Sequence, residues 1–480
     1  MRISEKLRLP SDRVIGRLTT ALFLLAVLAL NIVVFVFANA FSWFFYADTR
    51  YEHTVSDATD SLLAKIEHPV TVSFCSAEED LAASATSSLV YETAKQYAAR
   101  HEGLISVGGY YNVYTDYAKM KEYSEKTGAV VTKDTVIVES DIECYALTMS
   151  NFFLLDQSGT IRAYNGEEAF ASAFLRVQTE KEKLPVAYFT VDHGETFAVE
   201  SLLSQIFYAG YDVGITELNT VKLSDEEVPS NAALLVISNP IYDFETSNGG
   251  VATEIDRLAA YIEGGGKVYI TLDAGHANYA GLHNLRALLK EYGFTTEETP
   301  VVDFQNGVPG EERIFSVSFA KDGVGKAVGE RIARYSDRSV LVRDTAPITL
   351  SENQKGMTVS PLLVTADSAA HKDKNGAFIA AAYASGENGA GIVLSTSGYI
   401  NFDDAVNTEK YANEDFLYES LSLLGASTPL SGCTMLTLED QGLNDLTNAE
   451  ANAFSIITVA VLPVTLLLFG IGLTLYRRRR

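Results

Sequence analysis

Two uncharged apolar tracts, one near each end of the 480-residue chain, constrain its fold more than any other feature of the sequence. The first lies within residues 18–47, which contain no Asp, Glu, Lys or Arg, and the second covers residues 453–476. A helix of about 20 apolar residues can cross a hydrocarbon layer roughly 30 Å thick. We therefore predict transmembrane helices over 18–40 and 453–476, with one large polar region between them.

The basic residues predict the orientation of these two helices. Nine of the 37 Lys and Arg residues lie in the short tails 1–17 and 477–480, directly beside the apolar tracts. Because basic residues favour the cytoplasmic side, we expect both tails in the cytoplasm of a cell membrane and the polar region outside it. That region keeps 28 basic residues (37 minus nine) against 60 acidic ones (62 minus Glu5 and Asp12), a formal charge near −32. Such a charge argues against a nucleic-acid partner.

The first apolar tract has a second interpretation as a cleaved signal peptide. Ala38-Asn39-Ala40 has the small-x-small form of a signal-peptidase site. However, the tract is longer than the roughly 7–15 apolar residues of a signal core, and five aromatic residues within 41–46 suit a membrane interface. We expect a retained anchor, and cleavage after Ala40 stays open.

Alternating strand and helix patterns fill the polar region and predict an α/β fold class. After a membrane-proximal helix over 41–66, we expect a first extracytoplasmic α/β domain over 67–181 and a second over 184–430. A linker and the start of a helix over 431–452 lead into the second span. The second domain has the clearer pattern, with strands expected at 186–191, 233–239 and 267–273, and helices at 196–210, 252–266 and 282–294. Short links between these elements favour a doubly wound parallel sheet.

Polar residues follow three of the expected strands and form the candidate site. Asp192, His193 and Glu195 follow the first strand, Asn239 ends the second, and Asp273 and His276 follow the third. Ligands of open α/β sheets bind beyond the carboxyl ends of the strands, so these side chains could bind a ligand or act as acid and base. The alternative is a polar turn, with Gly194 in a turn conformation and Asp192 capping the next helix.

The sequence does not contain the motifs of several specific catalytic and binding sites. Ser238 has no flanking glycine, so a nucleophile elbow is not predicted. Gly264–Gly266 follows a helix and precedes a strand, which is typical of a helix end and not of a phosphate loop, and no G-x-x-x-x-G-K-[ST] motif occurs. His276 and His283 lack the i, i+4 spacing of a helical metal site. The three cysteines have no C-x-x-C spacing. We predict neither a metal nor a cofactor, and no enzymatic activity.

The order of these segments resembles the GldG-like family, the auxiliary component of certain ABC-type transport systems first associated with gliding motility. "VAYFTVDHGE" looks like the family's strand and GHGE-like turn, with Asp192 where glycine is usual. "LAAYIEGGGKVYITLDAG" is similar to its helix, paired glycines and strand. "GIVLSTSGYINFDD", "ANEDFLYESLSLL" and the final "LPVTLLLFGIGLTLYRRRR" look like its closing strand, helix and terminal span with an arginine tail.

The resemblance implies an extracytoplasmic domain related to glutamine-amidotransferase-like folds but without the nucleophile. It also implies a complex with an ABC permease and a separate ATPase, and it supplies no catalytic residues. We therefore expect a non-enzymatic, two-pass subunit of an ABC transporter complex. Two alternatives stay open: a membrane-anchored hydrolase of the cell envelope that works through His193, and a module that senses an envelope ligand.

Overall fold

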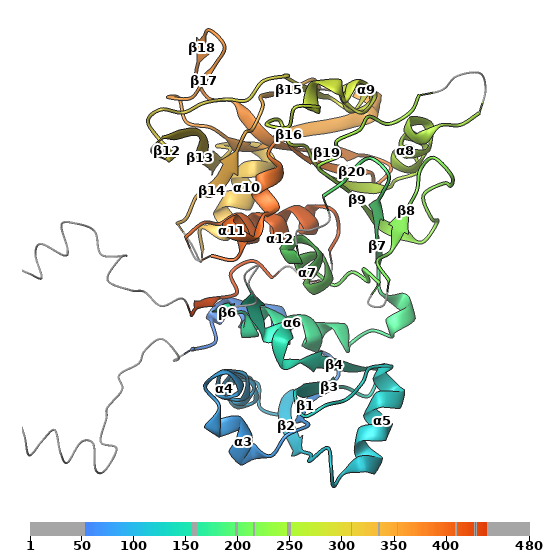
Figure 1. Cartoon of the computed structure of the whole chain (residues 1–480), viewed down its shortest axis with the longest axis vertical. Coiled ribbons are helices and arrows are strands. Elements are labelled where there is room, and N and C mark those ends of the chain that lie inside the picture. Colours follow the sequence, from blue (N-terminus) through green and yellow to red (C-terminus); the bar gives the residue numbers. More distant parts are fainter. Residues whose placement is uncertain are drawn as a thin grey trace, which may run out of the picture. The chain divides into compact units, whose positions relative to one another are not determined.

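The computed structural model describes residues 53–155, 161–196, 200–214, 217–246, 251–308, 310–334, 337–352, 354–408, 410–426, 428 and 430–438 (Figure 1). The predicted membrane spans at 18–40 and 453–476 lie outside these residues, as do both basic tails. None of the helices within the described ranges has the length and apolar character needed to cross a membrane.

A four-stranded sheet organises residues 70–148. Its strands have the order β2-β1-β3-β4, with β1 parallel to β2 and antiparallel to β3, and β3 antiparallel to β4. The strands are β1 (Val70–Phe74), β2 (Ile105–Tyr110), β3 (Thr135–Glu139) and β4 (Cys144–Thr148). Sequence patterns predict β1, β2 and β3. β4 is not apparent from the sequence, since its side chains are mostly half-buried and do not alternate between buried and exposed.

Helices cover both faces of this sheet because successive side chains of a strand point to opposite sides. Val136 and Val138 join the main apolar core with side chains of α4 (Ala85–Arg100) and α6 (Gly166–Arg176), whereas Ile137 packs with α5 (Tyr117–Thr127). The remaining elements of this region are α2 (Asp57–Leu63), α3 (Glu78–Ala83), β5 (Phe153–Leu155) and β6 (Ile161–Tyr164).

A second, 12-stranded sheet organises residues 186–395, and the strands from β8 at one edge to β20 are parallel. These strands, in spatial order, are β8 (Thr220–Val221), β7 (Val186–Thr190), β9 (Ala232–Ser238), β10 (Lys267–Thr271) and β20 (Gly391–Ser395). The prediction of an α/β class is confirmed at this level. The three strands expected after residue 184 correspond to β7, β9 and β10.

The other half of the large sheet is antiparallel, which differs from the predicted doubly wound parallel arrangement. The strands beyond β20 are β19 (Ile379–Gly386), β16 (Met357–Val364), β13 (Glu311–Phe319) and β12 (Gly307–Val308), with β11 (Phe294–Thr296), β14 (Val340–Arg343) and β15 (Ile348–Leu350) paired at their sides. For β19 and β20, where the direction changes, the physical reason is the short connection at 387–390, where Gly389 has φ of 90°. Such a short turn joins antiparallel neighbours only. β17 (Ala370–His371) and β18 (Lys374–Asn375) form a separate hairpin.

Helices cover both faces of the large sheet as well. Leu234 and Val236 face the same core as α7 (Glu200–Tyr208), α10 (Gly323–Ile332) and α12 (Asn413–Leu423). Leu235 and Ile237 face the core that contains α8 (Glu254–Glu263) and α9 (His283–Glu291). The short helix α11 (Asp403–Val406) precedes α12.

The two sheets share one continuous apolar core through α6, which packs against α7 near α12 (Figure 1). Arg176 at the end of α6 fastens this junction, because its Nη2 donates to the carbonyl oxygens of Phe207 at 2.8 Å and Tyr211 at 2.9 Å. The division into domains at 67–181 and 184–430 stays a prediction.

Asn413, at the start of α12, joins that helix to the edge of the large sheet. Its fully buried amide Nδ2 donates to Leu341 O at 2.9 Å and Ile400 O at 3.0 Å, and its Oδ1 accepts from Leu341 N at 2.8 Å. The side chain thereby satisfies three backbone groups that water does not reach.

We predict that Asn413→Ala lowers the free energy of unfolding by about 2–4 kcal/mol, because it leaves three buried backbone groups without partners. Chemical denaturation of the purified chain measures this change. Asn231→Ala, at an exposed asparagine, is the matched control and should change stability by no more than about 0.5 kcal/mol. Equal effects of the two variants would contradict the assigned role of Asn413.

Candidate functional site

The turn after β7 is held in place by backbone conformation and by an ion pair. Asp192 has φ of 84° and Gly194 has φ of 70°, a left-handed conformation that glycine adopts without strain. The Asp192 carboxylate lies 2.6 Å from Lys222 Nζ. Residues 192–196 are not helical, so the expectation that Asp192 caps the next helix is wrong. The ion pair with Lys222 explains its position instead.

His193 lies beneath this turn and is only 3% exposed. Its Nδ1 is 3.0 Å from Glu195 Oε1 and its Nε2 is 3.0 Å from Glu254 Oε2. The ring stacks on Phe244 with centroids 3.7 Å apart and an interplanar angle of 12°. Burial alone lowers the pKa of the imidazole, but the two carboxylates outweigh burial and raise that pKa above its ordinary value.

These contacts make His193 a link between three segments. We call His193, Glu195, Phe244 and Glu254 the His193 clamp. Its carbonyl oxygen accepts from the backbone N–H groups of Ile241 and Tyr242, after β9, while Glu254 brings in the first turn of α8. Both ring nitrogens are engaged and the ring is covered. The geometry is that of a charged structural link, and it leaves no imidazole nitrogen free to take a proton from a ligand.

Glu254 and Phe244 are the members of this clamp that the sequence did not reveal. Thr253 and Asp256 form a capping box at the start of α8. That T-x-x-D pattern marks the start of a helix, and so places Glu254 in a first turn, beside the strand ends. No local pattern identifies Phe244 as the residue beneath the histidine.

The other predicted site residues have separate local partners. Asn239, at φ 50°, is 7% exposed, and its Oδ1 has no hydrogen-bond donor. Asp273 Oδ1 accepts from Gly275 N at 3.0 Å, and the exposed His276 accepts through Nδ1 from Asn278 N at 3.2 Å. Of the six predicted residues, only His193 and Glu195 are joined to each other by a hydrogen bond between side chains.

Two further expectations for the strand ends concern Ser238 and a metal ion. Ser238 is 2% exposed, and its Oγ donates to Thr196 O at 3.2 Å, with no histidine in contact. Over the described ranges, no group of three or more His, Cys, Asp or Glu side chains is arranged to hold a metal ion.

A cavity of about 470 Å³ lies at the far end of α8 from His193, against Glu263, Tyr292, Lys355 and Glu387. Lys355 Nζ is 2.9 Å from Glu263 and 2.8 Å from Glu291, and these carboxylates raise its pKa. The lysine is therefore charged and paired. It is not an activated amine.

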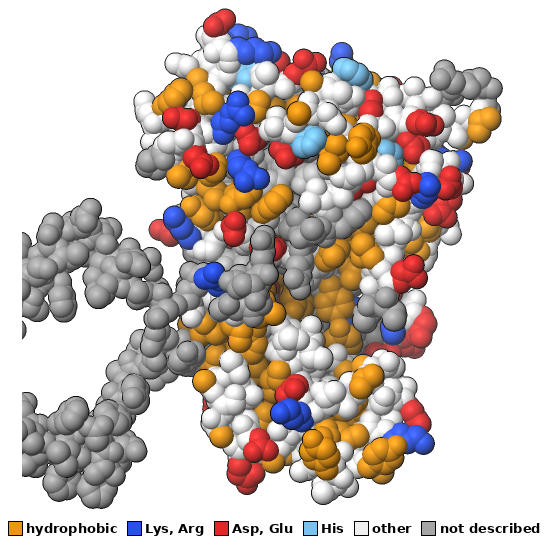
Figure 2. All heavy atoms as spheres, in the orientation of Figure 1, with side chains coloured by type: hydrophobic (Ala, Val, Ile, Leu, Met, Phe, Trp, Pro, Cys, Tyr) orange, Lys and Arg blue, Asp and Glu red, His pale blue; other side chains and the backbone are white. Residues whose placement is uncertain are grey.

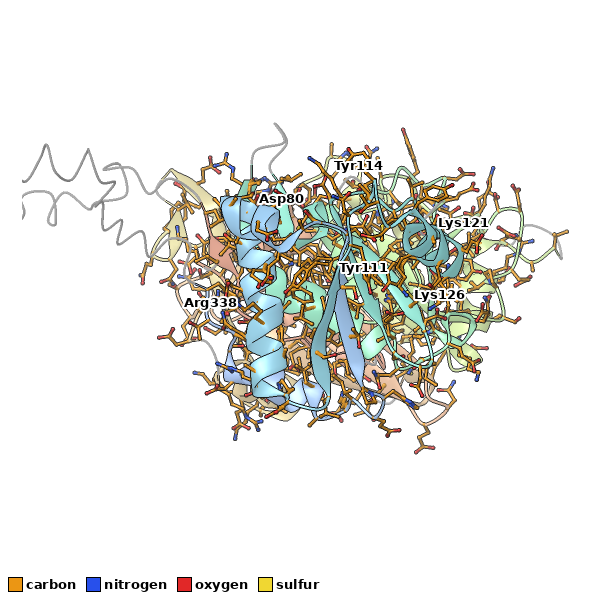
Figure 3. All side chains as sticks on the ribbon, turned by 90° about the horizontal axis from the view of Figure 1, so that it is seen from below. Asp80, Tyr111, Tyr114, Lys121, Lys126 and Arg338 are labelled. Atoms are coloured by element: carbon orange, nitrogen blue, oxygen red, sulfur yellow. The ribbon has the colours of Figure 1, made fainter. Side chains whose placement is uncertain are left out.

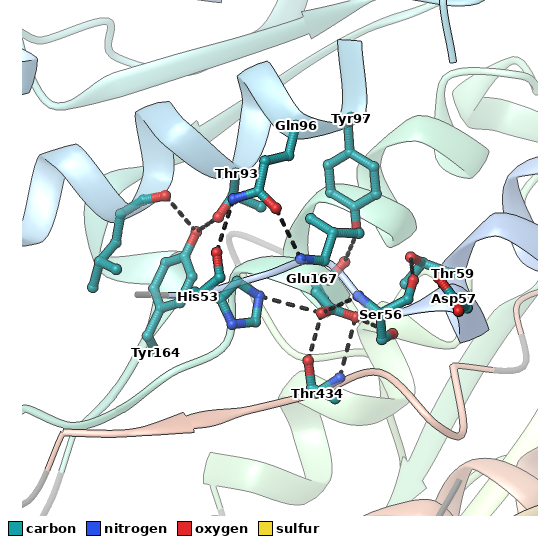
Figure 4. Close-up of polar contacts among 12 residues, drawn as sticks. His53, Ser56, Asp57, Thr59, Thr93, Gln96, Tyr97, Tyr164, Glu167 and Thr434 are labelled. Atoms are coloured by element: carbon teal, nitrogen blue, oxygen red, sulfur yellow. Dashed lines mark hydrogen bonds and ion pairs between the residues drawn. The ribbon is translucent and has the colours of Figure 1, made fainter. Parts of the chain in front are cut away.

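A second polar centre joins the two ends of the described chain (Figure 4). The Glu167 carboxylate is fully buried in the first turn of α6. It accepts from Ser56 N at 2.8 Å, Ser56 Oγ at 2.6 Å and Thr434 N at 3.2 Å, and also from Thr434 Oγ1. His53 Nε2 lies 3.2 Å away.

The charge on Glu167 is stabilised by these contacts. Burial alone raises the pKa of the carboxyl, but its contacts with His53, Ser56 and Thr434 outweigh burial and lower that pKa below its ordinary value. The positive end of the α6 dipole favours a carboxylate at the same position. Nearby, β21 (Leu436–Thr437) pairs with β6, so segments 53–56 and 432–437 meet at one place.

No protein-family model matches the chain, and no curated protein matches it. Among solved structures, the mmIFT52 N-terminal domain is similar over 50% of this chain and 96% of that chain, at 16% identity and a TM-score of 0.37. A putative ThuA-like protein from Bacteroides uniformis is similar over 52% of this chain and 96% of that chain, at 12% identity and a TM-score of 0.30. The exo-beta-1,4-mannosidase Op5Man5 from Opitutaceae bacterium strain TAV5 is similar over 73% of this chain and 50% of that chain, at 12% identity and a TM-score of 0.25. Likenesses at these scores carry no argument about the function of this chain.

We predict that His193→Ala lowers the free energy of unfolding by about 3–5 kcal/mol, because it leaves Glu195 and Glu254 buried without their shared partner. The matched control is His276→Ala, at an exposed histidine, with an expected change of no more than about 0.5 kcal/mol. Urea denaturation checks both values.

The loss should also depend on pH. The raised pKa of His193 stabilises the fold fully below its unfolded value of 6.5, and this contribution disappears as pH rises through the folded-state pKa. The lowered pKa of Glu195 stabilises the fold above 4.5, and this contribution disappears as pH falls. The stability difference between wild type and His193→Ala should thus be largest between pH 4.5 and 6.5 and smaller on either side. A difference that does not vary with pH would refute the charged clamp.

We predict that Glu167→Ala loosens both chain ends together. Removal of the charged acceptor should speed backbone hydrogen exchange in 53–56 and 432–438 by about 10–100-fold, the equivalent of one to two charge-assisted hydrogen bonds. Mass spectrometry of exchanged peptides measures the change, with Glu182→Ala, at an exposed residue, as the control. Faster exchange in only one of the two segments would show that Glu167 does not join them.

Proposed function

We propose that this chain is a non-enzymatic, membrane-anchored auxiliary subunit of an ABC transporter complex. Two transmembrane helices hold its α/β unit outside the cytoplasm, where that unit contacts the substrate or a partner. The tails 1–17 and 477–480 lie in the cytoplasm, and a permease and a separate ATPase complete the complex. We also propose that residues 184–430 form a doubly wound domain of the glutamine-amidotransferase-like kind, extended by the antiparallel strands.

The observation that carries this proposal is the meeting of the two ends of the described chain at Glu167. Only residues 41–52 separate the first apolar tract from the described unit, and only 439–452 separate the unit from the second. An extended chain spans at most about 3.6 Å per residue, so linkers of 12 and 14 residues set upper limits of about 43 and 50 Å on the distance of the two tracts from the segments that Glu167 joins. Two helices that leave one place on the unit can enter the same membrane side by side.

The chemistry of the strand ends supports a role without catalysis. His193 is the histidine that the hydrolase alternative requires, and both of its nitrogens are engaged in a buried clamp. On the face drawn in Figure 2, acidic and basic side chains are interspersed and no broad basic patch gathers. This surface agrees with the absence of nucleic acid among the proposed partners.

A topology experiment tests the extracytoplasmic location. Tyr114 is 86% exposed and lies at the rim of the view in Figure 3, so Tyr114→Cys gives an accessible thiol. Burial raises the pKa of Cys75 to about 11 and that of Cys144 to about 12, and it raises that of Cys433 well above its ordinary value, so the native thiols react slowly. We predict that a membrane-impermeant maleimide labels Tyr114→Cys in intact cells, whereas wild type stays unlabelled. Labelling that requires broken cells would place the unit in the cytoplasm.

Co-purification tests the proposed complex. The tagged chain, solubilised in mild detergent, should retain an ABC permease and an ABC ATPase. Asp273→Asn and His276→Ala remove the candidate acid and base that are not part of the buried clamp, and we expect transport in cells to be unchanged by both. Isolation of the chain without either ABC component would contradict the proposal, and loss of transport in these two variants would show that the strand-end side chains take part in the function.

A further inference from the structure

The loop after β2 exposes tyrosine side chains at one end of the small sheet. Residues 110–117 read YYNVYTDY, with four tyrosines in eight positions. Tyr114 is 86% exposed, Tyr117 at the start of α5 is 72% exposed, and Tyr110 at the end of β2 is 37% exposed. We call these three side chains the tyrosine surface. Tyrosine rings that remain in water are typical of protein surfaces that bind a partner.

Hydrogen bonds within the loop fix the backbone that carries these rings. Asp116 Oδ2 accepts from Asn112 N at 2.7 Å, and Asp116 N donates to Asn112 O at 2.8 Å. Asn112 Oδ1 accepts from Tyr114 N at 2.9 Å. A tyrosine on a fixed backbone has only two side-chain torsions to lose when it binds. The loop therefore presents its rings at a small entropic cost.

The tyrosine surface lies beyond the carboxyl ends of the parallel strands β1 and β2, which is where open α/β sheets bind ligands. The hydroxyl of Tyr110 donates to that of Tyr91 at 3.5 Å, and the hydroxyl of Tyr91 donates to Glu78 in the first turn of α3. In Figure 3, Asp80 of α3 and Tyr114 lie toward the same end of the small sheet. The tyrosine surface and the first turn of α3 therefore share one end of this sheet.

This end of the small sheet carries negative charge without a basic partner. Its acidic side chains are Glu78, Glu79, Asp80 and Asp116. Within the described ranges, none of the four forms an ion pair with a lysine or an arginine. The neighbouring helix α5 differs, since both of its glutamates are paired with lysines. A partner that neutralises the four carboxylates is favoured by Coulomb attraction.

We propose that the tyrosine surface binds a basic segment of a partner protein through arginine side chains. A guanidinium group is weakly hydrated and stacks on aromatic rings. Arginine and tyrosine are also among the residues that most often dominate the binding energy of a protein interface. The unpaired carboxylates around the rings complement the charge of the segment. Such docking requires only an accessible loop, and it does not depend on the proposed transporter role.

Two other ligands of aromatic surfaces fit less well. A single-stranded nucleic acid also stacks on tyrosines, but its phosphates would meet the carboxylates at this end of the sheet. A sugar ring also packs against tyrosine, but a neutral sugar leaves the charge of the four carboxylates unbalanced. The charge therefore favours a cationic segment.

Fluorescence anisotropy of labelled peptides tests the proposal on the full chain in detergent. The probe is an octapeptide of alternating arginine and glycine, and the matched peptide has lysine in place of arginine. In about 150 mM NaCl, attraction to distant acidic residues is screened beyond about 8 Å. We expect saturable binding of the arginine peptide, about threefold or more tighter than that of the lysine peptide, because guanidinium groups stack on the rings better than ammonium groups do.

Ring variants locate the binding. Tyr114→Ala combined with Tyr117→Ala should weaken binding of the arginine peptide by about 5–30-fold, the loss of two exposed cation–π contacts. Tyr114→Phe combined with Tyr117→Phe keeps both rings and should stay within about twofold of wild type. The control is Tyr242→Ala, at a tyrosine that is 61% exposed after β9, which should bind like wild type. The thiol probe Tyr114→Cys lacks one of the rings, so docking that would shield its thiol is weakened as well.

Charge variants test the role of the carboxylates. Glu79→Gln combined with Asp80→Asn should weaken binding by about 2–5-fold, and this difference should vanish in about 1 M salt, where the Debye length is about 3 Å. Glu102→Gln, at an exposed carboxylate before the other end of β2, is the control and should have no effect. The substituted side chains are exposed, so these variants should unfold at the wild-type temperature.

Three results would overturn the proposal. The first is equal binding of the arginine peptide by wild type and by the double tyrosine-to-alanine variant, which would show diffuse attraction to the acidic surface. The second is binding to wild type that is absent or is equal for the two peptides. The third is protection of residues 110–117 from hydrogen exchange by chitotetraose without any binding of peptide, which would identify a glycan surface.

Discussion

A single buried carboxylate holds the two ends of the described chain against each other. Glu167 accepts hydrogen bonds from Ser56 and Thr434, which are hundreds of residues apart in sequence, and it does so from the first turn of α6. An ionised carboxylate is stable inside a protein only when hydrogen-bond donors surround it. The segments that supply those donors are held in place because their departure would leave a buried charge without partners. Segments 53–56 and 432–437 and the first turn of α6 therefore meet at this carboxylate.

Buried carboxylates recur at several places where elements distant in sequence meet. Glu195 and Glu254 enclose His193 and tie the turn after β7 to α8, and Glu168 of α6 accepts from the Tyr418 hydroxyl of α12 at 3.0 Å. The three centres differ in what the carboxylates contact: backbone and hydroxyl donors at Glu167, an imidazole at Glu195 and Glu254, and a tyrosine hydroxyl at Glu168. In the transporter subunit that we propose, such links would hold the unit rigid so that a partner meets a defined surface.

Regular, local patterns in the sequence predict much of the fold. The alternation of apolar strands and amphipathic helices from 186 to 294 places β7, β9, β10, α8 and α9 within a few residues of their observed bounds. The antiparallel half was not predicted, although Asn388-Gly389 is a hairpin signal of the kind that could have revealed the β19–β20 turn. Only part of the site could be predicted from the sequence. His193 and Glu195 are close in sequence, whereas Glu254 is 61 residues from His193, and Glu167 is 267 residues from Thr434. No periodicity reports on contacts over such separations.

The most direct test of the account is the distance between residues 54 and 438, the two ends of the described chain, in the membrane-embedded protein. Spin labels on Thr54→Cys and Leu438→Cys, in a background where Cys144 is Ser, report this distance by double electron–electron resonance. Leu438 N donates to Arg162 O at 2.8 Å, and Thr54 lies beside the segment held by Glu167, so both labels sit on anchored backbone. The account predicts one narrow distribution at the short end of the measurable range. A broad distribution at long distances would show that the ends leave the unit separately, and it would remove the basis for two adjacent membrane anchors.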